Sequence, residues 1–172
     1  RRQKLQSELE RAAPADPGNA SLLTRLARGN LLIGRKYEAR DWATKALAIA
    51  PKDQLAAYVM AQSYVAEGNQ ARALEILNAA FDADHPQLDA LLLLTNLMLE
   101  NKNYVELERL ATLGQERFPL DASWLAGLAV AYRESVQHDK LTAVLTRLAE
   151  GDSDDPAIRV ELAKLARDRN DL

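Results

Sequence analysis

The feature that most constrains this chain is a period of 34 residues. A large apolar residue recurs at that interval and is followed each time by a small or short one, as in Leu26-Ala27, Met60-Ala61, Leu94-Thr95, Leu128-Ala129 and Leu162-Ala163. A fixed period of this length is typical of arrays in which each short helical unit buries its apolar face against its neighbours. The period therefore predicts one continuous stack, whose usual work is to hold another molecule.

Turn residues keep the same interval. Gly34 and Gly68 align with Lys102 and Val136. Pro17, Pro51 and Pro119 align near the ends of units, with Pro86 one place late and Ser153 at the corresponding position of the fourth unit. Glycine supplies the positive φ that ends a helix, and proline is tolerated only in the first turn of the next one. Each unit therefore reads as helix, tight turn, helix and proline-marked turn.

We predict an all-α fold, a right-handed α-solenoid of antiparallel helix pairs with about ten helices. The chain is rich in Ala and Leu, which favour helix over strand. The predicted segments are the second helix of a preceding repeat at 1–17, repeats at 20–53, 54–87, 88–121 and 122–155, and the first helix of a further repeat at 156–172.

The repeated residues resemble the tetratricopeptide repeat, or TPR, over the whole chain. The second unit carries the family pattern at Ala57, Met60, Ala61, Tyr64, Gly68, Ala73 and Ala80, and the first at Leu23, Leu26, Ala27, Gly34, Ala39, Ala46 and Pro51. The third and fourth units depart from it at Thr95, Leu107, Gly114, Val136, Leu141 and Leu148. We expect these two units to pack less regularly.

The repeat register is incomplete at both ends, which suggests an excerpt of a longer array. Ile158, Leu162 and Leu165 are expected to lack a following helix that covers them. Self-association through exposed terminal helices is therefore one expectation.

Composition argues against catalysis and against a bound cofactor or metal. The chain has no cysteine, its two histidines lie far apart, and its glycines form no phosphate-binding cluster. The apolar runs are too short for a membrane span, so no direct membrane insertion is predicted. Residues 1–50 carry a basic excess and the remainder an acidic one, a pattern typical of solvated helix faces. Composition leaves the compartment open between cytoplasm and periplasm.

The resemblance implies that the first helix of each unit lines a concave groove. Family positions that contact ligands, transferred by register, give a candidate peptide groove of Thr24, Arg28, Tyr58, Gln62, Leu92, Asn96, Val130, Arg133 and Lys164. An apolar strip beside a hydrogen-bonding strip suits an extended peptide or a partner helix. We therefore expect a non-catalytic module that binds protein or peptide.

Two family modes are disfavoured by the same register. The positions of a carboxylate clamp hold Thr24, Arg28, Val59, Asp89 and Leu93, most of which lack the needed donor. The base-reading positions of RNA-binding relatives are mostly apolar and the pI is near 5.5, so no nucleic acid is expected. The alternative is a structural spacer or self-association segment of a larger enzyme or membrane-associated protein.

Overall fold

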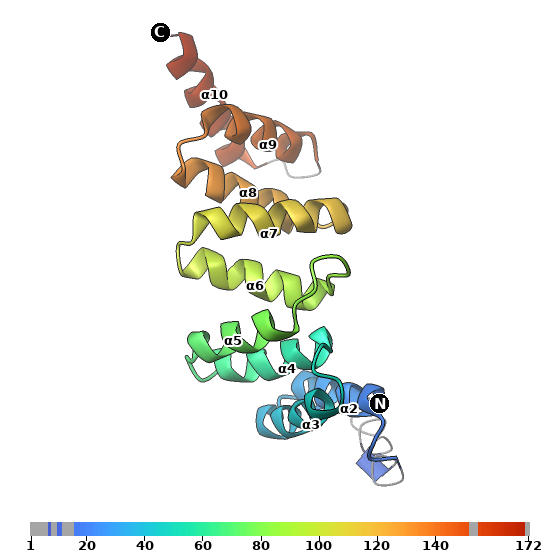
Figure 1. The fold of residues 1–172 in the computed structure, drawn as a ribbon. Coiled ribbons are helices and arrows are strands. Elements are labelled where there is room, and N and C mark those ends of the chain that lie inside the picture. The colour runs from blue at the N-terminus through green and yellow to red at the C-terminus, as the bar shows by residue number, and fades with distance from the viewer. Residues whose placement is uncertain (1–6, 8–9, 12–15, 152–154, 171–172) are drawn as a thin grey trace. The chain divides into compact units, whose positions relative to one another are not determined.

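The computed structural model describes residue 7, residues 10–11, residues 16–151 and residues 155–170. Within these ranges the chain forms nine named helices and no strand (Figure 1). They are α2 (Ala20–Leu32), α3 (Lys36–Ile49), α4 (Gln54–Val65), α5 (Gln70–Ala80), α6 (Leu88–Glu100), α7 (Tyr104–Arg117), α8 (Ser123–Glu134), α9 (His138–Glu150) and α10 (Pro156–Asn170). The predicted all-α array of helix pairs is confirmed. The segment predicted as a helix at 1–17 lies mostly outside the described residues.

The helices group into two compact units, Arg1–Leu94 and Thr95–Leu172, divided within α6. In unit 1, α2 packs on α3, α3 on α4 and α4 on α5, and α2 also contacts α4 directly. In unit 2, α7 packs on α8, α8 on α9 and α9 on α10. Because short turns connect α2 to α3, α4 to α5 and α8 to α9, the two helices of each of these contacting pairs run antiparallel.

The turn between the two helices of a pair has the same backbone in four places. Gly34, Gly68, Lys102 and Val136 all have positive φ, at 82°, 77°, 55° and 56°. The amide of the next residue donates in each case to the carbonyl five residues earlier, with N···O distances of 2.8–2.9 Å. This bond satisfies a carbonyl that the helix end would otherwise leave free. The turn is therefore kept at Val136, although the departure from glycine there predicted a less regular unit.

Short polar side chains begin several of the helices. Asn19, Asn69 and Asn103 each accept a hydrogen bond from the backbone amide three residues later, at the start of α2, α5 and α7. Asp53 accepts from two amides at the start of α4. Such caps satisfy donors that have no partner inside the helix.

Small residues fill the contacts between paired helices in unit 1. Ala27, Ala39, Ala46, Ala61 and Ala73 are fully buried, as the repeat pattern predicts. Their small side chains let the helix backbones approach, and Leu23, Leu26 and Val59 fill the space around them.

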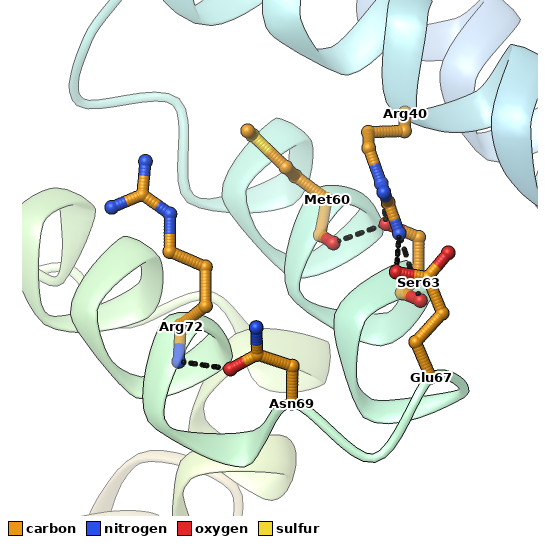
Figure 2. A network of polar contacts seen from close by, with 6 residues as sticks. All are labelled: Arg40, Met60, Ser63, Glu67, Asn69 and Arg72. Atoms are coloured by element: carbon orange, nitrogen blue, oxygen red, sulfur yellow. Dashed lines mark hydrogen bonds and ion pairs between the residues drawn. The ribbon is translucent and has the colours of Figure 1, made fainter.

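A polar network joins α3 to α4 in unit 1 (Figure 2). Arg40 donates from Nε to the Ser63 hydroxyl at 2.8 Å and from Nη2 to the Ser63 carbonyl at 3.1 Å. Its Nη2 also lies 2.8 Å from Glu67 Oε2, and its guanidinium carbon lies 4.0 Å from the centre of the Tyr64 ring. The hydroxyl of Ser63, a fully buried residue, donates in turn to the Met60 carbonyl at 2.6 Å. One arginine thus satisfies groups on α4 and in the turn that follows it.

In unit 2 a large side chain replaces the small-residue pattern. Trp124 on α8 is fully buried, and its ring covers Gly114 on α7. A Cβ added at Gly114 would lie 2.3 Å from Trp124 Cδ2, so this helix contact requires glycine. Trp124 Nε1 donates to the Phe118 carbonyl at 3.1 Å, which satisfies the indole.

The apolar residues of α10 are better covered than the sequence suggests. Leu165 is 8% exposed and belongs to the buried cluster formed with Leu141 and Leu145 of α9. Ile158 and Leu162 are half-buried against the same cluster. These three residues therefore pack against the helices that precede them, and the predicted lack of a following helix stays a prediction.

Candidate functional site

All nine predicted groove residues lie on the first helices of their pairs, namely α2, α4, α6, α8 and α10. Unit 1 contains Thr24, Arg28, Tyr58, Gln62 and Leu92, and unit 2 contains the remaining four. The structure uses some of these side chains internally and leaves others open to solvent.

Thr24 of α2 is used by the fold itself. It is 4% exposed, and its hydroxyl donates to Asp53 Oδ2 at 2.5 Å. The other oxygen of Asp53 caps α4, so this carboxylate joins two first helices. The Thr24 hydroxyl is therefore already engaged within the fold.

Arg28 reaches from α2 to the start of α6. Its Nη2 lies 3.3 Å from Asp89 Oδ2, and about half of the Arg28 side chain stays exposed. Asp89 also accepts from Gln87 Nε2 at 3.2 Å. This ion pair is longer than the 2.7–2.8 Å contacts that Arg40 and Arg133 make with their glutamates. Arg28 is therefore held loosely and remains open to another acceptor.

Tyr58 and Gln62 of α4 stand one helical turn apart, and both are half-buried. Gln62 Nε2 donates to the Tyr58 hydroxyl at 3.4 Å, a distance near the limit for a hydrogen bond. Leu92 of α6 is also half-buried, so unit 1 offers an apolar side chain as well as amide and phenol groups.

In unit 2, two of the predicted residues are exposed to solvent and one is a half-buried apolar residue. Asn96 of α6 and Lys164 of α10 are exposed, and Val130 of α8 is half-buried. Their order along the first helices is an amide, a branched aliphatic group and an ammonium group.

Arg133 of α8 is committed to Glu161 of α10. Its Nε and Nη2 donate to Oε1 and Oε2 of Glu161, both at 2.7 Å. The hydrogen bonds from Arg133 lower the pKa of Glu161, and the nearby charges of Arg133 and Lys164 lower it further. The same hydrogen bond raises the pKa of Arg133. This bidentate pair fixes α8 to α10 and leaves Arg133 fewer free donors for a ligand.

The structure adds Asp89, Asp53 and Glu161 to the site. None of them is among the nine predicted groove residues, although Asp89 stands at one of the carboxylate-clamp positions. A search for opposite charges on successive first helices would have found Arg133 and Glu161, because Arg133 lies on the first helix of one unit and Glu161 on the first helix of the next. Thr24 with Asp53 offered no such signal, since a threonine hydroxyl carries no charge.

No cluster of ligands suited to a metal ion occurs among the residues that the structure describes. In the same part of the chain, none of the helices combines the length and apolar character needed to cross a bilayer.

No protein-family model and no curated protein matches the sequence. Solved structures with a similar fold include YrrB, PilF and TTC0263. YrrB, a TPR protein described as having an unusual peptide-binding site, is 13% identical, with 94% of this chain and 84% of YrrB covered at a TM-score of 0.81. PilF of Pseudomonas aeruginosa is 18% identical, with 88% and 69% covered at 0.67. TTC0263, a TPR protein of Thermus thermophilus, is 20% identical, with 96% and 91% covered at 0.64. At these identities the likeness concerns the fold.

Proposed function

We propose that this chain, which has the tetratricopeptide-repeat fold, is a non-catalytic module that binds an extended peptide or a partner helix on its first helices. TPR-like structures support a protein-interaction or scaffold role, and peptide binding is stated for YrrB. We also propose that the repeats occupy 20–53, 54–87, 88–121 and 122–155, with part-repeats at 1–17 and 156–172.

The observation that carries the proposal is the weak internal use of polar groups in unit 1. Arg28 and Gln62 have internal contacts of 3.3 Å and 3.4 Å, which are long for the donors involved. A peptide carbonyl or carboxylate replacing these contacts would gain shorter hydrogen bonds. Tyr58 and Leu92 beside them supply aromatic and aliphatic area for peptide side chains.

Unit 2 supplies a second set of contacts of the same kind. Asn96 can pair with a peptide amide, Val130 can pack against an apolar side chain, and Lys164 can pair with a carboxylate. Arg133 contributes by holding Glu161 and thereby the position of α10.

Selection of peptides from a random displayed library against the purified chain tests this proposal. Peptides so obtained should bind at least tenfold more weakly to Tyr58→Ala/Gln62→Ala, because stacking area and an amide donor are lost together. The matched control is Arg72→Ala/Asn78→Ala on α5, which changes two exposed residues on a second helix. Equal binding by wild type and the first-helix variant would contradict the proposal.

The alternative is a spacer or self-association segment of a larger protein, enzyme or membrane-associated assembly. Val160 of α10 favours it, since this valine is 53% exposed on the last described helix. Sedimentation velocity over a range of concentrations should then show a dimer that Val160→Asp dissociates. A monomer at all concentrations would exclude self-association of this chain.

A further inference from the structure

Two arginines on the exposed side of α2 share a single ion-pair partner. Arg25 and Arg28 stand one helical turn apart, and both are exposed. Arg28 Nη2 lies 3.3 Å from Asp89 Oδ2, whereas the side chain of Arg25 makes no ion pair or hydrogen bond with another residue that the structure describes. Asp53 is taken up by the Thr24 hydroxyl and by two amides at the start of α4, which compensate its charge. Arg25 is therefore left without a carboxylate on this surface.

The ion pair of Arg28 joins two first helices that are not consecutive. Arg28 lies on α2 and Asp89 in the first turn of α6, and α4 is the first helix between them in chain order. α4 packs on α2. Gln54, the first residue of α4, bonds to the His85 carbonyl at 2.9 Å and to the Gln87 amide at 3.1 Å, just before α6. The pair therefore joins two segments that both contact α4, the helix that carries the proposed aromatic and amide contacts of unit 1.

Asp89 can release Arg28 at little cost. Its carboxylate lies in the first turn of α6, where the helix dipole favours a negative charge, and it also accepts from Gln87 Nε2 at 3.2 Å. Arg28, by contrast, has no second carboxylate partner among the described residues. Because about half of the Arg28 side chain is exposed, the pair contributes little to stability. A carboxylate from another molecule can therefore replace that of Asp89.

An exposed leucine continues the same side of α2. Leu32 follows Arg28 by one helical turn and is 61% exposed. Arg25, Arg28 and Leu32 thus have the i, i+3, i+7 spacing of one helical face. The order along this face is two guanidinium groups and then an aliphatic group. A segment complementary to it carries negative charge close to an apolar side chain.

We propose that the partner segment held by the first helices carries an aspartate or glutamate side chain, which takes Arg28 from Asp89, and an apolar residue that packs on Leu32. Arg25 adds a second positive charge to this contact. The inference rests on the proposed peptide-binding function and gives the class of peptide. Asp89 is then an internal competitor, because its carboxylate occupies the guanidinium that the incoming carboxylate needs.

Two displayed libraries of random peptides test the inference. The central residue is fixed as glutamate in the first and as glutamine in the second, and the random positions of both exclude aspartate and glutamate. The libraries are mixed in equal amounts, selected against the purified chain and sequenced. Glutamate-centred peptides should outnumber glutamine-centred ones by at least about tenfold, because only they supply a charged acceptor. Apolar residues should be enriched close to the centre.

Variants identify the competing carboxylate. The probes are the most enriched glutamate-centred peptide and its copy with glutamine at the centre. Asp89→Asn should tighten binding of the glutamate peptide about threefold to tenfold, and Arg28→Gln should weaken it about tenfold. Neither variant should alter binding of the glutamine copy, and Arg28→Gln/Asp89→Asn should lose the gain of Asp89→Asn. The matched control, Asp41→Asn, removes the same charge from the exposed side of α3 and should leave binding unchanged.

The outcomes separate this inference from the proposed function. Equal recovery of the two libraries, unchanged binding in Asp89→Asn, or an equal gain in Asp41→Asn would overturn the inference. The proposed function would still stand if the recovered peptides lost affinity in Tyr58→Ala/Gln62→Ala. Recovery of no peptide, or of peptides that bind this variant as they bind wild type, would overturn both.

Discussion

At the scale of single residues, the four left-handed turns show that main-chain hydrogen bonds impose a conformation even where the side chain opposes it. Gly34 and Gly68 adopt it without strain, whereas Lys102 and Val136 adopt it at a cost. The amide after each residue makes the same bond to the preceding helix in all four cases. The helix pair therefore sets the turn, and the residue at its centre adjusts.

Replacement of Val136 by glycine should stabilise the chain by about 0.5 to 1 kcal/mol. Removing a β-branched residue from the left-handed region stabilises the folded state by about 1–2 kcal/mol. The greater backbone entropy that glycine loses on folding offsets about 0.5–1 kcal/mol of this gain. Urea denaturation measures the difference. Val105→Gly, at an exposed valine in α7, is the matched control and should destabilise the chain. A loss of stability in both variants would disprove the strain argument.

Gly114→Ala should destabilise unit 2 by about 1–3 kcal/mol, because the new methyl group would overlap the ring of Trp124. Gly127→Ala is the control: its added Cβ meets Ala111 Cβ at 3.6 Å, an ordinary contact, so helix propensity should make it neutral or stabilising. In a thermal-denaturation double-mutant cycle, Trp124→Leu should offset part of the Gly114→Ala loss. Additive effects of the two substitutions would show that the residues do not interact.

The sequence predicts which small residues are buried, but it does not explain the valine at position 136 or the glycine at position 114. Ala27, Ala61 and Ala73 recur at the repeat interval, and their burial follows from the period alone. Gly114 is visible in the sequence only as a departure from alanine. Its cause is the ring of Trp124 on the next helix, a contact that occurs once and leaves no periodic signal.

At the scale of helices, charged side chains fix neighbouring helices more specifically than the apolar pattern does. Arg40 binds Ser63 of α4 and Glu67 in the turn after it, and Arg133 binds α10 through Glu161. The register placed the predicted groove residues on first helices, but it could not tell which of them are available. Arg133 is occupied because its partner Glu161 lies in the following repeat, and Thr24 is occupied because Asp53, the last residue of its own repeat, turns one carboxylate oxygen toward it. A residue's position within one repeat reveals neither contact.

Arg40→Met should destabilise unit 1 by about 1–3 kcal/mol, since it leaves the buried Ser63 hydroxyl and the Glu67 carboxylate with fewer partners. Arg40→Lys should recover little of this loss, because an ammonium cannot reproduce the planar set of donors that also stacks on Tyr64. The control is Arg72→Met, which removes an exposed pair with Glu75 and should change stability by less than about 1 kcal/mol. Chemical denaturation compares the three variants, and full recovery by lysine would contradict the stacking argument.

The pair between α8 and α10 should respond to pH. Arg133 lowers the pKa of Glu161, so the folded state favours the ionised carboxylate. Its stabilisation is present at neutral pH and lost as pH falls through the folded-state pKa. Glu161→Gln should therefore cost less than about 1 kcal/mol at neutral pH, because the pair is partly exposed, and nothing at a pH well below the lowered folded-state pKa of Glu161. Denaturation at several pH values checks this, and a pH-independent difference would exclude the ionic contribution.

At the scale of the whole molecule, the contacts within each unit join helices that lie close together in the sequence. In such arrays stability is approximately a sum of terms for each unit and its immediate neighbours. The fold class therefore followed from the period, because every unit repeats the same local problem. The binding surface did not follow to the same degree, since it depends on residues that differ from one unit to the next.

Hydrogen exchange should reveal this locality. Gly114→Ala should accelerate amide exchange in α7 and α8, where the overlap arises, and leave α2 and α3 close to wild type. Mass spectrometry of peptic fragments resolves the helices. Uniform acceleration along the chain would show that it unfolds as a single cooperative body.

The shared turn has a practical consequence, because its main chain stays in place when its side chain changes. The sequence contains no cysteine, so a cysteine placed at Lys102 or Val136 would be the sole thiol in this chain. Both side chains point away from the core, and a dye attached there would sit on a fixed pivot. Fluorescence anisotropy of such a label at Val136 would report local motion of the α8–α9 turn, and the same label at Lys102 would report local motion of the α6–α7 turn.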